Sequence, residues 1–187
     1  MNPYDIVHLT LYALGGRIEG RTKLQKTIYF VGIFIDSLDD LGYRPHFYGP
    51  YSDLVTAAVA RLKSLGFLTE STLGSGAIGV AGFEIARHDF QLTKEGERIA
   101  EEKAKQNPDV WTKLNIAVDR FKKAGHIDYM RMSVAAKTYH MLRAKGKPAT
   151  PEELCESARS LGWETKPNEI EQSISFLQKL GLVVAKA

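Results

Sequence analysis

The histidines and the single cysteine are the residues of this chain that could bind a metal or carry out nucleophilic chemistry. Cys155 excludes an internal disulfide and a thiolate zinc site because it has no second cysteine to pair with. It follows Glu152 and Glu153, an acidic setting that disfavours a reactive thiolate, and we interpret it as a small buried hydrophobe. No HExxH motif and no metal-ligand spacing joins the five histidines: His8, His46, His88, His126 and His140. We therefore predict a non-enzymatic protein without a metal or cofactor.

Two further clusters have the composition of a ligand site but lack its full pattern. The glycine-rich stretch at residues 74–79 has no Lys-Ser/Thr pair, so a flexible loop tip explains it better than a phosphate-binding loop. Asp39 and Asp40 could bind a cation, but an acidic helix end beside Gly42 accounts for them better.

Positive charge is concentrated in the second half of the chain. Residues 1–106 carry 12 Lys/Arg against 13 Asp/Glu, whereas residues 107–187 carry 13 against 9, which gives the net +3. Between Lys113 and Lys147, nine basic residues are balanced only by Asp119 and Asp128. Such an excess can bind a polyanion, and a solvated helical face is the alternative.

Hydrophobic spacing predicts the elements that position these residues in the first half of the chain. Helical periodicity and N-cap residues predict helices at residues 2–14, from 22 to between 39 and 43, and at 52–65. Two β-prone segments then predict a hairpin from Phe67 to Phe90 with a mobile, glycine-rich tip. Three helices followed by a hairpin is the order of a winged helix-turn-helix. Thr93 is expected to cap a further helix that runs to about Lys105.

Asn107-Pro108 marks the predicted boundary between two domains, residues 1–106 and 107–187. The second domain is expected to contain helices at residues 110–124, 129–144, 150–162 and 168–181, with a capping box that begins at Thr150. The segment LQKLGLV at 177–183 matches LKSLGFL at 62–68, where a helix ends at glycine and a β-prone run follows. We interpret this as a second helix-turn-helix module whose wing is cut short at Ala187.

Basic residues at the start of the second helix and on the later helices are candidates for contact with DNA phosphates. The candidate nucleic-acid-binding residues are Arg21, Lys23, Lys26, Thr56, Arg61, Lys63, Lys122, Lys123, Arg143 and Lys145. The third helix offers few side chains that read bases, and Asp53 would repel phosphate. We therefore predict weak, salt-sensitive and largely sequence-tolerant binding to double-stranded DNA.

The segment HFYGPY at residues 46–51 is rich in aromatic residues, and Pro45 and Pro50 exclude a helix there. These aromatic side chains can pack the turn between two helices. The alternative is that an exposed subset binds a protein partner, for which the candidates are His46, Tyr48 and Tyr51.

The segments KLQK at 23–26, followed by Tyr29, and FYGPYS at 47–52 resemble the YwgA-like group of small bacterial and archaeal proteins. That group is similar in turn to the Panacea (SocA-type antitoxin) domains. The resemblance covers roughly the first half of the chain. In addition, Phe90-x-Leu92-Thr93-x-x-Gly96 resembles the end of the second wing strand in many winged-helix regulators. The Panacea likeness implies an antitoxin-like or adaptor function.

These observations lead us to expect a mostly α-helical protein with small β-hairpin wings, built as two tandem winged-helix modules joined by helices. The expected function is DNA binding in transcription regulation, in the cytoplasm and without membrane attachment; the alternative is a protein-interaction module. We also expect a homodimer, because the helices at 110–144 carry an apolar stripe larger than a small domain needs: Trp111, Leu114, Val118 and Phe121.

Overall fold

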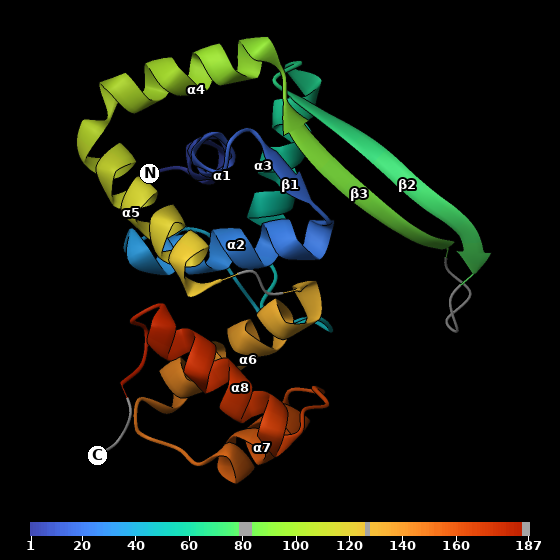
Figure 1. Cartoon of the computed structure of the whole chain (residues 1–187), viewed down its shortest axis with the longest axis vertical. Helices are drawn as coiled ribbons and strands as arrows, with labels where there is room; N and C mark the ends of the chain where they lie inside the picture. The colour runs from blue at the N-terminus through green and yellow to red at the C-terminus, as the bar shows by residue number, and fades with distance from the viewer. Residues whose placement is uncertain (79–83, 126–127, 185–187) are drawn as a thin grey trace.

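A computed structural model describes residues 1–78, 84–125 and 128–184 and is mostly α-helical, with one small antiparallel sheet (Figure 1). This confirms the predicted fold class. The elements are α1 (Pro3–Ala13), β1 (Arg17–Glu19), α2 (Arg21–Phe34), α3 (Asp53–Ser64), β2 (Leu68–Ile78), β3 (Glu84–Leu92), α4 (Lys94–Gln106), α5 (Pro108–Ala124), α6 (Tyr129–Lys145), α7 (Pro151–Ser160) and α8 (Pro167–Lys179).

The sheet contains the predicted hairpin, β2 and β3, which projects from the helical body as a long wing (Figure 1). Its strand order is β1-β3-β2, and all pairs are antiparallel. The short strand β1 was not predicted; it places Ile18 opposite Phe90 and joins the wing to the core. β2 continues through Gly74 and Gly76 to Ile78, so this part of the predicted glycine-rich tip belongs to the strand, and the rest of the tip lies outside the described residues.

Helix α2 differs from the prediction at both ends. Its N-cap is Gly20, with φ 88°, rather than Thr22, because the amide of Gly20 still bonds to the carbonyl of His88 and the helix starts directly after β1. The helix ends at Phe34, well before the predicted 39–43. Asp36 has the left-handed φ of 54°, and its neighbour Ser37 donates its amide to the carbonyl of Gly32, which closes the helix end.

The first core packs α1, α2 and α3 against the sheet, and α5 adds Leu114 and Val118 to it. The Asn107-Pro108 break is thus a boundary between two helices, and the core continues across it. The apolar stripe that suggested a homodimer is accounted for inside this chain. Leu114 and Val118 are buried. Trp111 packs on Tyr12, and Phe121 packs on Phe30. The stripe therefore gives no support to dimerisation.

Helix α4 is joined to the wing and to α1 through a Thr-x-x-Gly segment. Thr93 caps the helix, accepting from the amide of Gly96 at 3.0 Å and donating to the carbonyl of Gly66 at 2.8 Å. A Cβ atom on Gly96 would lie 2.1 Å from the carbonyl oxygen of Phe67, so no larger residue fits there. The buried His8 donates to the carbonyl of Gly96 at 2.8 Å. The predicted motif that ends at Gly96 therefore marks the point where α4 packs closely against Phe67, just before β2.

Helices α6, α7 and α8 form a second helical unit, which lies beside α2 and away from α4 (Figure 1). Tyr29 and Phe30 of α2 pack against α6 and α8, and Trp163 closes a smaller core between α6, α7 and α8. The predicted capping box at Thr150 is present. Among the described residues, which end at Val184, no strand follows α8, so the predicted second wing has no counterpart in them.

Candidate functional site

The aromatic turn, residues 43–52, is the second part of the connection between α2 and α3, and Gln25 of α2 bonds to both of its ends. The side-chain amide of Gln25 donates to the carbonyl of Ser52 at 2.9 Å, and its oxygen accepts the amide of Ser52 at 3.1 Å. The hydroxyl of Tyr43 donates to the carbonyl of Gln25 at 2.6 Å. Ser52 then caps α3 by accepting from the amide of Val55 at 3.0 Å. One glutamine of α2 thereby fixes both ends of the turn.

Lys26, the last residue of the KLQK segment, lies beneath the same turn. Its side chain is only 1% exposed, and Nζ donates to the carbonyl of Pro50 at 2.6 Å. Burial, with a smaller contribution from the charge of Lys137, lowers the pKa of Lys26 to about 7. The KLQK segment and the turn are therefore two halves of one hydrogen-bonded unit. Lys26 must be removed from the candidate DNA contacts, because its ammonium group faces the turn and not solvent.

The second helical unit holds the turn from the opposite side. Ser133 of α6 donates to the carbonyl of Tyr48, and the indole N–H of Trp163 donates to the carbonyl of His46 at 2.6 Å. Gly49 has φ 91°, and a Cβ atom there would lie 2.9 Å from Cγ of Lys137, so only glycine fits. The backbone of the turn is thus fixed from α2, from α6 and from the segment after α7.

This rigid backbone presents aromatic rings to solvent. Phe47 is 72% exposed and Tyr48 49% exposed, and their ring centroids lie 4.9 Å apart, edge to face. His46 is also exposed and packs on Tyr51, which is partly buried and whose hydroxyl lies 2.7 Å from that of Thr56. Of the predicted partner-binding residues, His46 and Tyr48 are therefore available. Phe47, the most exposed, was not among them, although it stands in the same aromatic segment.

Two of the candidate DNA contacts, Arg21 of α2 and Lys63 of α3, share one carboxylate of the wing. Glu70 of β2 binds Arg21 at 2.8 Å, His88 at 2.9 Å and also Lys63. Burial opposes ionisation of Glu70, but the hydrogen bonds and charges of Lys63 and Arg21 outweigh it and lower its pKa to about 2. Arg61 lies over the ring of Tyr4, 5.1 Å from the centroid. Arg21 and Lys63 would therefore have to leave Glu70 before they could bind a phosphate, whereas Arg61 contacts a ring.

Thr56 and the N-terminal end of α3 are likewise occupied by contacts within the chain. The hydroxyl of Thr56 accepts from Gln25 at 3.0 Å and so belongs to the turn. Asp53, the first residue of α3, pairs with Arg44. A recognition helix reads bases with its N-terminal residues, and in α3 the acidic Asp53 occupies that position.

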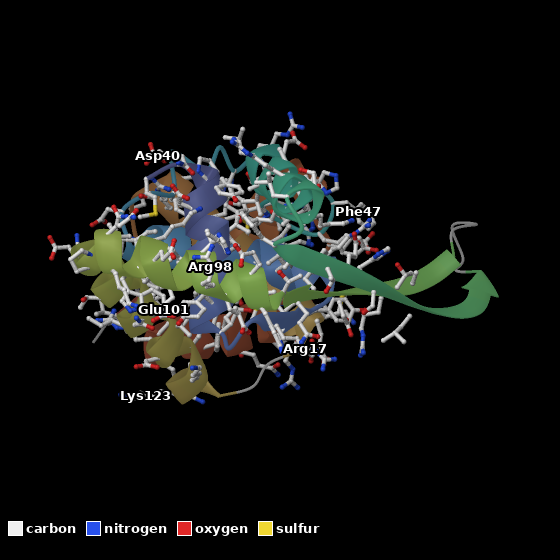
Figure 2. The ribbon with its side chains drawn as sticks, turned by 90° about the horizontal axis from the view of Figure 1, so that it is seen from above. Arg17, Asp40, Phe47, Arg98, Glu101 and Lys123 are labelled. Atoms are coloured by element: carbon white, nitrogen blue, oxygen red, sulfur yellow. The ribbon has the colours of Figure 1, made fainter. Side chains whose placement is uncertain are left out.

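The remaining candidate cations lie elsewhere on the molecule. Lys23 and Lys122 line an open hollow of about 520 Å³, together with Arg17, and Lys123 is exposed nearby on α5. Within the described residues, no ion pair involves Lys23, Lys122 or Lys123. In the view of Figure 2, Arg17 and Lys123 lie toward the lower edge of the molecule, and Phe47 lies above them at the right.

The last two candidates, Arg143 and Lys145, are in the C-terminal turn of α6. Arg143 pairs with Asp39 at 2.9 Å, and Lys145 is partly exposed. The structure thus separates the ten candidates into several groups and does not form one continuous basic surface from them. No group of three or more His, Cys, Asp or Glu within residues 1–78, 84–125 and 128–184 is arranged to hold a metal ion. None of the helices in those ranges has the length and apolarity that a membrane crossing requires.

The fold and the turn define a mostly helical protein with a three-stranded antiparallel sheet and a second helical unit that packs on an aromatic turn. No family model matches the chain. It is similar to "Uncharacterized protein YwgA" of Bacillus subtilis (strain 168), with 40% identity over 62 residues. That match spans 33% of this chain and 37% of YwgA, so it covers about a third of either protein. It supports the predicted likeness to YwgA.

Proposed function

We propose that this chain is a non-enzymatic protein-interaction module that presents the aromatic turn to a protein partner, in an adaptor-like or antitoxin-like role. The observation that carries the proposal is the exposure of Phe47 and Tyr48 on a backbone fixed from three sides. Aromatic anchors dominate the energy of protein interfaces, and a rigid anchor loses little conformational entropy on binding. The partner is expected to offer an apolar pocket for the ring of Phe47.

The pairing of basic residues favours this function over DNA reading by α3 and the wing. Arg21 and Lys63 share Glu70, and Asp53 stands at the start of α3. A DNA phosphate would have to compete with Glu70 for both cations, and each exchange would return little binding energy.

Affinity capture with the purified chain, in the presence of nuclease, tests the proposal. The double variant Phe47→Ser/Tyr48→Ser should lose a stoichiometric protein partner that the wild type retains. Leu65→Ser is the matched control, because Leu65 is a 50% exposed apolar residue at the other end of α3. The proposal would be contradicted if the double variant captured the partner as well as the wild type does. It would also be contradicted if only nucleic acid were recovered when nuclease is omitted.

Duplex DNA is a second candidate partner, and one observation favours it: Lys23 and Lys122 line one hollow, and Lys123 is exposed nearby. Binding there would be weak and tolerant of sequence, and its log–log salt slope would be about 0.9 per neutralised phosphate. Lys23→Gln/Lys122→Gln/Lys123→Gln should flatten that slope, whereas Arg61→Gln should not. If the triple variant keeps the salt slope of the wild type, these lysines are solvated and do not contact DNA.

A further inference from the structure

The loop after α2 and the C-terminal half of α6 enclose a hollow of about 390 Å³ that the proposed function does not use. Its walls include Tyr29, Leu38, Asp39, Tyr43, His140 and Arg143. A second hollow of about 300 Å³ shares Leu38, Asp39 and Arg143 with it. Pockets for small molecules start at about 300 Å³, so the pair is large enough for a compact ligand.

The inner wall of this hollow carries a buried hydroxyl without a partner. Tyr29 is 1% exposed, and its hydroxyl makes no hydrogen bond to any described residue. Its ring packs edge-to-face on Tyr43 at 5.0 Å and on Phe30 at 5.5 Å. Burial raises the pKa of Tyr29, so the hydroxyl keeps its proton and remains a donor. Buried polar atoms are nearly always hydrogen-bonded, and an orphaned one points to a missing partner.

The mouth of the hollow carries a guanidinium group that a ligand can recruit. Arg143 is half-exposed and pairs with Asp39 at 2.9 Å, but the side chain of Asp39 is 89% exposed. Such a pair is worth little in water, so an anion with better geometry can displace Asp39. His140 contributes a neutral imidazole, because burial and the charge of Arg143 lower its pKa. The inner wall therefore offers the hydroxyl of Tyr29 and the imidazole of His140, and the two carboxylates that line the pair of hollows, Asp36 and Asp39, belong to exposed residues.

We propose that this hollow binds a small aromatic carboxylate, whose ring packs against Tyr29, Tyr43 and Leu38. Its carboxylate accepts hydrogen bonds from the hydroxyl of Tyr29 and from the guanidinium of Arg143. Aromatic walls favour a flat apolar ring, and the two donors favour an anion over a neutral or cationic group of the same shape.

Benzoate, benzamide and benzamidine test this site because they keep one ring and change only the charge of its substituent. Binding is followed in proton–nitrogen NMR spectra of the whole chain through the indole N–H of Trp163, whose ring packs on His140 at 5.8 Å. Benzoate should give saturable shifts and bind more tightly than the other two. Arg143→Gln and Tyr29→Phe should each weaken benzoate binding about tenfold to a hundredfold.

Two control variants share the chemistry but lie away from the hollow. Arg159→Gln changes an exposed arginine at the end of α7, and Tyr12→Phe removes a hydroxyl beside Trp111; both should leave benzoate affinity unchanged. The absence of saturable shifts at tens of millimolar benzoate would overturn the proposal. So would tighter binding of benzamidine, or equal affinity in wild type and Arg143→Gln. If Tyr29→Phe fails to fold, Arg143→Gln alone decides, since its side chain is half-exposed.

Discussion

Replacing the buried Lys26 with methionine tests whether the ammonium group beneath the aromatic turn lowers the free energy of unfolding. Lys26 is 1% exposed and its described hydrogen-bond partner is the carbonyl of Pro50. Its pKa in the folded chain is about 7, against an ordinary value of 10.5. Between these two pH values the unfolded chain binds more protons than the folded one. The free energy of unfolding must therefore rise with pH in this window.

The linkage relation gives the size of the effect. With a folded pKa of about 7 and an unfolded pKa of 10.5, Lys26 raises the free energy of unfolding by about 3 kcal/mol between pH 7 and 9.5. This is an upper limit, because any water that reaches the ammonium group raises its folded pKa. Lys26→Met keeps the length and the apolar stem of the side chain, removes the charge, and should abolish this slope. The lost bond to Pro50 should cost about 1 kcal/mol at every pH.

Urea unfolding followed by circular dichroism at pH 7 and pH 9.5 measures this slope directly. Lys23→Met is the matched control, since Lys23 is in the same helix but only partly buried. Apart from the two lysines, the groups that titrate in this range are common to both variants, so the loss of the slope in Lys26→Met alone identifies Lys26 as its source. If Lys26→Met retained the slope of the wild type, the ammonium group would be solvated and the reasoning would be wrong.

Three further variants probe the fold and the surface. Gly96→Ala places a Cβ 2.1 Å from a backbone carbonyl and should lower the free energy of unfolding by about 1–3 kcal/mol or more in urea titrations. Glu70→Gln should destabilise the chain by about 1–3 kcal/mol at pH 6. That loss should vanish near pH 2, because the pKa of Glu70 is about 2 when folded and 4.5 ordinarily. Phe47→Ser should shift the melting temperature very little, since 72% of the residue is exposed.

The parts of the fold that could be predicted from sequence are those fixed by local chemistry. Ser52 and Thr93 cap α3 and α4 through their own hydroxyls, and Thr150 forms a capping box, so the three helix starts follow from adjacent residues. The start of α2 could not be predicted in this way. It is set by the pairing of Gly20 with His88, which are far apart in the sequence. Strand β1 is only three residues long and was missed for the same reason.

The candidate site could also be predicted only in part, because the sequence gives the residue types but the fold decides which residues contact one another. A count of basic residues predicts a phosphate-binding face, but whether a lysine is free depends on what the fold places beside it. Glu70 is more than forty residues from Arg21, yet it pairs with both Arg21 and Lys63. Lys26 looks like a surface cation in the sequence, and its burial depends on a turn that begins 17 residues later. The aromatic segment was recognised, but the exposure of Phe47 within it could not be predicted.

The turn that presents Phe47 also links the first core to the second helical unit. A substitution of Trp163, in the second unit, therefore tests whether that unit holds the turn. The carbonyl of His46 accepts both the indole N–H of Trp163 at 2.6 Å and the amide of Gly49 at 2.8 Å. Trp163→Phe removes the indole donor, keeps an aromatic ring in the small core, and leaves Phe47 untouched.

Loss of a hydrogen bond worth about 1 kcal/mol should speed local opening of the turn several-fold. Hydrogen exchange at the amide of Gly49 measures this opening, and partner binding through Phe47 should weaken in parallel. Trp111→Phe is the control, because Trp111 packs on Tyr12, away from the turn. If exchange at Gly49 were the same in both variants, the indole bond from Trp163 would not hold the turn, and the contacts from α2 and α6 would be enough to present Phe47.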